Sequence, residues 1–239
     1  MVAGVWAELT DLVLPAECAG CAAERVPLRY GVCASCAATL EALRPGPVRP
    51  TPAPAGLPGC AALGAYQGVL REALLSYKER GRHGLARPLG LLLAEVVALL
   101  AAPAAGPPGP VLLVPVPATA RAIRARHGDH VRRLARHAAG RLRRSGWPVA
   151  VAQPLVALPR PDSAVLDSAG RAAAAASAFR LRPGRLPALR RTAEQATVIV
   201  LDDIVTTGVT LAAATRLLTG AGVAVRGAAV LAATPRRRA

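Results

Sequence analysis

The segment from Val198 to Thr210 carries the residues whose chemistry is easiest to interpret. Two adjacent aspartates, Asp202 and Asp203, follow a run of four apolar residues. Ionised carboxylates only accept hydrogen bonds, so this pair suits the vicinal hydroxyl groups of a ribose, which must donate them. Neighbouring carboxylates also repel each other, which is a cost that a segment without a ligand has no reason to carry. The pair therefore indicates a sugar site.

The residues after the aspartates suit a phosphate group. Threonine hydroxyls donate hydrogen bonds, and a glycine lets the backbone approach a ligand closely; the residues in question are Val205, Thr206, Thr207, Gly208 and Thr210. The apolar run 197–201 is typical of a buried parallel strand, and a helix is expected to begin at Thr210. A loop between a strand end and a helix start favours anions. The alternative is that Asp203 only caps a turn and the threonines are ordinary loop residues.

The whole segment resembles, without a gap, the phosphoribosyl-pyrophosphate (PRPP) motif of the type I phosphoribosyltransferases. The resemblance implies that Asp202 and Asp203 hold the ribose 2′- and 3′-hydroxyls and that residues 205–210 hold the 5′-phosphate. It also implies bound Mg²⁺ and displacement of pyrophosphate from C1 of PRPP by a nitrogen nucleophile. No residue stands out as an acid or base, so the catalytic residues and the acceptor stay unidentified.

A second basic segment follows another expected strand, at residues 111–116. Arg121, Arg124 and Arg126 lie between this strand and a helix expected at 129–145. Guanidinium groups bind pyrophosphate well, because their forked donors match its oxygens. We therefore expect the pyrophosphate here, the alternative being a solvated basic loop.

Four of the five cysteines form two C-x-x-C pairs, Cys18 with Cys21 and Cys33 with Cys36. Two such pairs complete a tetrahedral zinc site of the zinc-ribbon type, and four protein ligands make the metal structural. Two disulfides are the competing interpretation, which a cytosolic location disfavours. Cys60 lies outside the pattern and is expected to be a packed free thiol.

Strands alternate with helices along the remaining chain, which predicts an α/β fold with a mostly parallel, doubly wound sheet. Further strands are expected near 61–66, within 149–158 and at 223–232, and further helices near 69–79, 85–100 and 171–179. The predicted division is a zinc-ribbon module at 1–43, a proline-rich linker at 44–58 and a phosphoribosyltransferase-like domain at 59–239. Residues 158–179, with Arg160, Asp162 and Asp167, are a candidate lid.

The charge of the chain points to anionic partners. The net charge is +16 at a sequence pI near 11.4, which favours binding to polyanions. Aromatic residues make up only 3% of the chain, which argues against base-stacking platforms. Candidate contacts with nucleic acid are Arg132, Arg133, Arg136, Arg141, Arg143, Arg144 and the tail Arg236 to Arg238.

The sequence predicts a cytoplasmic protein without membrane insertion. The first residues, Met1 to Leu14, contain two acids and lack the basic start of a signal peptide. The longest apolar run, Leu89 to Ala105, is interrupted by Glu95 and Pro103. We therefore expect a buried helix there rather than a membrane span.

The order of the motifs is similar to that of the ComF family, the competence-associated phosphoribosyltransferase-like proteins. The likeness rests on the cysteine pairs, Tyr66 to Arg71, Tyr77-Lys78, a Pro-Val-Pro before the arginine-rich segment, Arg171 to Phe179, and the PRPP motif. It implies a zinc ribbon joined to a type I phosphoribosyltransferase fold. It also implies a link to DNA uptake, with single-stranded DNA and competence-machinery proteins as partners; a homo-oligomer stays open.

Two positions depart from that family. The family carries Arg-Gly-Phe-Asn where this chain has Arg126 to Asp129, and an asparagine where this chain has Ala174. These departures weaken the expectation that the acceptor side works as in other members. Two hypotheses therefore remain: a phosphoribosyltransferase, or a non-catalytic protein that binds a nucleotide, single-stranded DNA or partner proteins.

Overall fold

The structure is a computed structural model that describes residues 17–103, 106–159 and 178–235. Its centre is a sheet in the order β1-β2-β9-β7-β3-β4, with β8 beside β9. The strands are β1 (Gly46–Val48), β2 (Cys60–Ala65), β3 (Val111–Pro115), β4 (Val149–Val151), β7 (Thr197–Leu201), β8 (Ile204–Val205) and β9 (Gly227–Ala233). All pairs are parallel except β1 with β2. The predicted α/β class with a mostly parallel sheet is confirmed.

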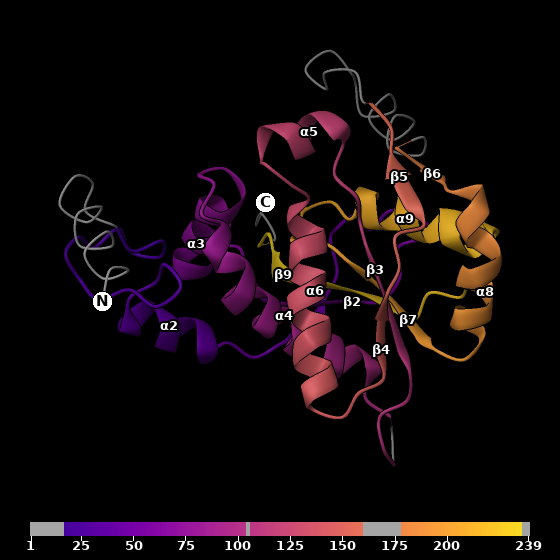
Figure 1. Cartoon of the computed structure of the whole chain (residues 1–239), viewed down its shortest axis with the longest axis horizontal. Helices are drawn as coiled ribbons and strands as arrows, with labels where there is room; N and C mark the ends of the chain where they lie inside the picture. Colours follow the sequence, from indigo (N-terminus) through magenta and orange to yellow (C-terminus); the bar gives the residue numbers. More distant parts are fainter. Residues whose placement is uncertain (1–16, 104–105, 160–177, 236–239) are drawn as a thin grey trace, which may run out of the picture.

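Helices cover both faces of the sheet. They are α2 (Ala34–Glu41), α3 (Gly68–Lys78), α4 (Ala86–Ala101), α5 (Ala120–Ala125), α6 (His130–Arg144), α8 (Leu186–Glu194) and α9 (Val209–Gly220). Figure 1 shows α4 and α6 together on one side of the sheet and α8 and α9 on the other. A small antiparallel sheet joins β5 (Leu155–Ala157) to β6 (Phe179–Leu181).

The strands divide their side chains between two cores because successive residues of a strand point to opposite faces. In β3, Leu113 packs in the core that α4 and α6 close, whereas Leu112 packs in the core that α9 closes. β7 alternates in the same way, with Ile199 in the first core and Val200 in the second. Burial on both faces explains why these strands are apolar throughout.

Helix α4 corresponds to the apolar run of the sequence. The stretch His83–Ala101 is long and apolar enough, by length and composition alone, to cross a membrane. In the structure, Leu89, Leu93 and Val97 of this helix are fully buried in the core. Gly90 gives α6 its close approach, since a Cβ there would lie 2.9 Å from the Leu134 carbonyl oxygen. The predicted buried helix is present.

The cysteine-rich module shares the core of the α/β domain. Cys18, Val32 and Cys36 belong to the same buried cluster as residues of α3 and α4. The Ser76 hydroxyl of α3 donates a hydrogen bond of 3.3 Å to the Ala19 carbonyl oxygen. The module is therefore packed against the domain.

The proline-rich segment 44–58 also contacts the domain. It contains β1, which the sequence did not indicate, paired with β2. Arg216 of α9 donates a hydrogen bond of 2.9 Å to the Ala55 carbonyl oxygen. The segment thus lies along the domain surface as well as connecting two parts of the chain.

Candidate active site

The candidate site lies where the connections after β3 and β7 diverge. The two strands are neighbours that end in register, with Pro115 opposite Leu201. The chain continues from β3 to α6 on one face and from β7 to α9 on the other. Such a switch point opens a crevice at the carboxyl ends of the strands. Here it is a cavity of about 450 Å³, the central cavity, whose lining includes Lys78, Arg126, His130, Asp202, Thr206 and Thr210.

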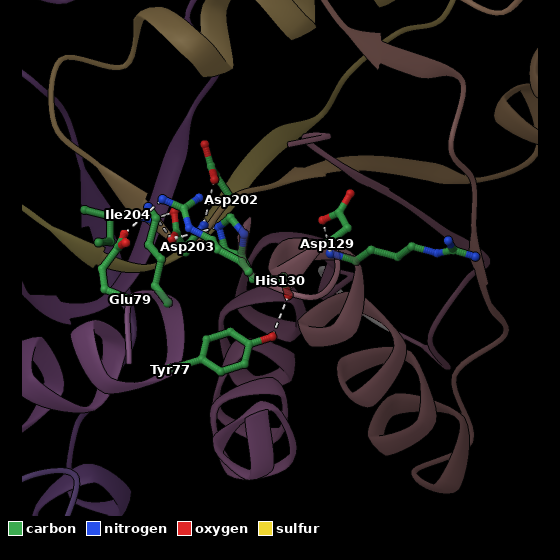
Figure 2. Close-up of polar contacts among 10 residues, drawn as sticks. Tyr77, Glu79, Asp129, His130, Asp202, Asp203 and Ile204 are labelled. Carbon is green, nitrogen blue, oxygen red and sulfur yellow. Dashed lines mark hydrogen bonds and ion pairs between the residues drawn. The ribbon is translucent and has the colours of Figure 1, made fainter. Parts of the chain in front are cut away.

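The two aspartates occupy different environments. Asp202 is half-buried and lines the central cavity; its Oδ1 atom accepts a hydrogen bond of 2.9 Å from the Asp203 backbone N–H. Asp203 is 4% exposed, and its Oδ1 atom accepts a hydrogen bond of 2.9 Å from the Ile204 backbone N–H. In Figure 2 the Asp202 carboxyl group lies apart from the contact between Asp203 and His130.

Two side chains from distant segments meet the Oδ2 atom of Asp203. Lys78 Nζ, at the end of α3, lies 2.8 Å away, and His130 Nε2, at the start of α6, lies 3.1 Å away. Tyr77 fixes α3 to α6, since its hydroxyl donates a hydrogen bond of 2.8 Å to the His130 carbonyl oxygen (Figure 2). The meeting of the end of α3 with the start of α6 therefore brings a cation and an imidazole to the acidic loop.

These different environments shift the pKa values of the two carboxyl groups in opposite directions. Burial and the neighbouring Asp203 carboxylate raise the pKa of Asp202 well above its usual value. Burial also opposes ionisation of Asp203, but the His130 hydrogen bond and the Lys78 charge outweigh it and lower the pKa of Asp203. Asp203 is thus the permanent anion of the pair.

The threonine loop leads into α9 as predicted, although the helix begins one residue earlier, at Val209. Gly208 adopts the left-handed conformation (φ 75°) at the helix start, where a Cβ would lie 3.0 Å from a Leu57 methyl carbon and 3.3 Å from Pro50 Cγ. Thr206 and Thr210 line the central cavity. Val205, Thr206 and Thr207 line a neighbouring cavity of about 610 Å³ that also includes Arg49.

The three arginines after β3 are not equivalent. The segment expected as a loop contains the short helix α5, which begins at the Thr119 cap. Only Arg126 lines the central cavity, where its Nη2 atom donates a hydrogen bond of 2.9 Å to Glu79 Oε1. Arg121 and Arg124 are exposed and line an adjacent cavity of about 670 Å³ with Arg126.

Comparison with known proteins supports a ribose-phosphate site. Residues 170–239 match the model of the phosphoribosyl transferase domain. The matched part includes β7, the acidic pair, the threonine loop, α9 and β9. No curated protein matches the chain.

The cysteines outside the phosphoribosyl transferase match gather as the sequence predicts. The four Sγ atoms of Cys18, Cys21, Cys33 and Cys36 lie within 4.8 Å of one another, and all are free thiols. Cys21 Sγ lies 3.8 Å from Cys33 Sγ, and a tetrahedral zinc–thiolate site has sulfur atoms about 3.8 Å apart. This group can hold a metal ion. The disulfide alternative does not occur here, and Cys60 is buried and unpaired as expected.

Backbone donors favour a thiolate at the centre of this cluster. The Cys33 N–H donates a hydrogen bond of 3.2 Å to Cys18 Sγ, and the Gly20 N–H lies 3.4 Å from the same atom. Burial opposes ionisation, but these donors outweigh it and lower the pKa of Cys18 to about 6. A thiolate is the form that binds a metal.

Sequence reasoning missed Lys78 and His130 as members of the site. Both belong to segments far from the acidic loop, so only the packing of α3 and α6 reveals their position. A signal was available for one of them, because Lys78 is the only lysine among 30 basic residues. The named residues of the candidate lid, Arg160, Asp162 and Asp167, fall outside the described residues, as does Ala174. Phe179, the last residue of the helix predicted at 171–179, instead begins strand β6.

Proposed function

We propose that the protein binds PRPP with Mg²⁺ and transfers its phosphoribosyl group to a nitrogen acceptor. The observation that carries the proposal is the acidic and threonine loop at a switch point of the sheet, bordering a cavity that also contains cationic side chains. The match of residues 170–239 to the phosphoribosyl transferase domain supports the same ligand class.

Different side chains of the cavity bind different groups of the ligand. Asp202 accepts hydrogen bonds from the ribose hydroxyls, as Asp203 was also expected to do. The residues that hold the 5′-phosphate are Val205, Thr206, Thr207, Gly208 and Thr210, at the start of α9, where backbone N–H groups and hydroxyls converge. Arg126 faces the departing pyrophosphate, with Arg121 and Arg124 at the adjacent surface.

Catalysis by such a site depends on positioning and on charge. Holding the ribose by its hydroxyls and its phosphate orients C1 toward the acceptor, and fixed cations stabilise the negative charge that grows on the leaving group. The acidic and polar cavity suits a Mg²⁺–PRPP complex, in which the metal ion neutralises pyrophosphate oxygens. The acceptor is an unidentified nitrogen nucleophile.

Calorimetry tests the ligand assignment. Titration of the full chain with PRPP and Mg²⁺ is expected to show binding, and Asp202→Asn is expected to weaken it about 10- to 100-fold. Glu194→Gln, an exposed acid on α8, is the matched control and leaves the affinity unchanged. Absence of binding by the native chain contradicts the assignment. Release of pyrophosphate with a panel of nitrogen bases and amines then tests turnover.

The second candidate is a non-catalytic, ComF-type competence factor that binds single-stranded DNA or partner proteins. What favours it is the net charge of +16 together with the outer face of α6, where Arg136, Arg141 and Arg144 are exposed. Arg143 is also exposed but donates to the Val149 carbonyl oxygen, and Arg133 bonds the His127 carbonyl oxygen. Arg132 is partly buried, and the tail at 236–238 lies outside the described residues.

Salt dependence tests the DNA candidate. Replacing the three exposed arginines of α6 by glutamine is expected to reduce the slope of log affinity against log salt by about two for single-stranded DNA. The same replacement at Arg182, Arg185 and Arg191, which are also exposed, removes equal charge elsewhere. Equal slopes for the two triple variants contradict a role for α6, and binding of PRPP without pyrophosphate release favours the non-catalytic function.

The remaining features complete the proposal. Zinc is the metal of the four-cysteine cluster, where it has a structural role because no ligand position stays open. The chain divides into a zinc module at 1–43, a connecting segment at 44–58 and a phosphoribosyltransferase-like domain at 59–239. We propose a cytoplasmic location without membrane insertion. We also propose that the protein can associate with further copies of itself.

A further inference from the structure

Lys78 is the only lysine in a chain with 29 arginines. The scarcity of lysine is general, so the position of the one that is present carries information. It lies at the carboxyl end of α3, lines the central cavity and has a side chain that is 26% exposed. Lysine differs from arginine in carrying a compact ammonium group with donors that rotate. The single lysine of the chain, with its compact ammonium group, therefore lies at the cavity proposed to hold the ligand.

The Asp203 carboxylate already has partners within the chain. Its Oδ1 atom accepts from the Ile204 backbone N–H, and its Oδ2 atom contacts both Lys78 and His130. Asp203 also lines the central cavity, but only 6% of its side chain is exposed and both of its oxygen atoms already have partners within the chain. Asp202 lines the same cavity, is more exposed than Asp203, and uses Oδ1 for a local backbone contact.

The pairing of Lys78 also leaves donors for a ligand. An ammonium group carries three N–H donors, and the carboxylate of Asp203 fixes its position at 2.8 Å. Arg126, the residue that follows α5, faces the same cavity, and Glu79, next to Lys78 in the chain, binds Arg126. Two cations from different elements thus border one cavity, each held by a carboxylate.

We propose that Lys78 contacts the pyrophosphate group of the ligand and that Asp203 is a positioning residue, which holds Lys78 and leaves the ribose hydroxyls to Asp202. The proposal rests on the proposed binding of PRPP and refines it. It moves the main pyrophosphate contact from Arg121 and Arg124, which are exposed at an adjacent cavity, to Lys78 beside Arg126.

A purely structural ion pair is the competing explanation, since Lys78 also neutralises the buried Asp203. The two roles differ in one observable property. A structural lysine stays paired with Asp203 whether ligand is present or not, so any ligand that fills the cavity, with or without a pyrophosphate group, shields it to the same extent. A lysine that contacts pyrophosphate is shielded by it.

Chemical labelling measures this shielding in the native chain. Because Lys78 is the only lysine, acetylation by an amine-reactive ester modifies this side chain and the chain's α-amino group, and peptide mass spectrometry separates the two. PRPP with Mg²⁺ is expected to slow acetylation of Lys78 about tenfold or more, whereas the α-amino group reacts at its former rate. Pyrophosphate with Mg²⁺ gives the same protection, and ribose 5-phosphate gives none.

Two variants complement the labelling. Lys78→Met is expected to weaken PRPP binding about 10- to 100-fold, the effect of losing a charged hydrogen bond. Arg80→Met, which removes a charge two residues away on a side chain that is 59% exposed, is expected to bind as the native chain does. If Lys78→Met fails to fold, the labelling of the native chain still decides.

The outcomes separate the inference from the function on which it rests. PRPP that binds the native chain without protecting Lys78 overturns the inference and leaves the proposed function intact. Protection by ribose 5-phosphate instead of pyrophosphate overturns the assignment to pyrophosphate. If PRPP does not bind at all, the proposed function fails. In that case, protection of Lys78 by pyrophosphate supports a site for anions at Lys78. Lack of protection by pyrophosphate overturns the anion site as well.

Discussion

Adjacent residues of one type perform different tasks in this site. Asp202 faces the central cavity and its surroundings raise its pKa, whereas Asp203 is buried, ionised and in contact with Lys78 and His130. The difference comes from the neighbours of each carboxyl group, since the two residues share a backbone segment. The stability of the fold should therefore respond in opposite directions to the same substitution at the two positions.

The sign follows from the direction of each pKa shift. The pKa of Asp203 is lowered, so its contribution is complete above the unfolded value and is lost as pH falls; Asp203→Asn is expected to cost about 2–3 kcal/mol at neutral pH. The pKa of Asp202 is raised, so ionising it destabilises the fold as pH rises; Asp202→Asn is expected to add about 1 kcal/mol.

Urea unfolding of both variants between about pH 4 and pH 8 checks this prediction. The Asp202 difference should shrink toward the acidic end, because that carboxyl group is then protonated in the native chain. The Asp203 difference should persist over this range, because its lowered pKa keeps it ionised, and it declines only at more acidic pH. Shifts of the same sign at neutral pH would show that the two aspartates share one environment.

The sequence predicts the acidic loop well and its surroundings poorly. The strand, the aspartates and the threonines lie in one short segment, and local pattern is enough to place them together. Lys78 and His130 reach Asp203 only because the end of α3 meets the start of α6, where Tyr77 bonds the His130 carbonyl oxygen. No local pattern encodes such a contact.

At the scale of elements, the long apolar segments are predicted more reliably than the short ones. β3, β7 and α6 fall within a residue or two of their expected ranges, because burial imposes a period on many residues. The short elements β1 and α5 were missed. Strand β1 has three residues and helix α5 has six, which is too few to show a repeating apolar pattern. The conformation of β1 depends on its pairing with β2, and that of α5 on the Thr119 cap. Strand β9 begins later than expected, at Gly227.

The pairing of α4 with α6 is the contact between elements on which the cavity depends, since α6 carries His130. Gly90 of α4 lies where the helices approach, and a Cβ there would be 2.5 Å from His137 Cβ and 2.9 Å from the Leu134 carbonyl oxygen. Gly90→Ala is therefore expected to separate the helices at a cost of about 1–3 kcal/mol.

Gly140 provides a matched control on the partner helix. A Cβ at Gly140 would meet only the Arg144 side chain, at 3.5 Å. Gly140→Ala is expected to stabilise the chain by about 0.5–1 kcal/mol, because alanine is the better helix former. Thermal unfolding of both variants measures the contrast, and equal effects would rule out close packing at Gly90.

At the scale of the whole molecule, the cysteine module and the α/β domain share one buried core. Val32 and Cys36 cluster with residues of α3 and α4. The ring of Tyr30 also lies 4.8 Å below the Arg87 guanidinium carbon at the start of α4. The cysteine module packs against α3, whose last residue is Lys78. Folding of the module is therefore connected to the cavity that Lys78 lines.

Removal of the metal tests this connection. A segment as short as the cysteine module has little core of its own, so a metal held by the four cysteines would supply much of its folding free energy. Chelation is expected to lower the melting temperature of the whole chain by about 10 °C or more, in a single transition, because the shared core couples the two parts. Calorimetry with and without chelator, alongside metal analysis, measures the shift.

The variant Cys60→Ser is the control, since Cys60 lies outside the cluster and its loss leaves the metal content unchanged. Two separate transitions, with the upper one unmoved by chelation, would show that the α/β domain folds without support from the module.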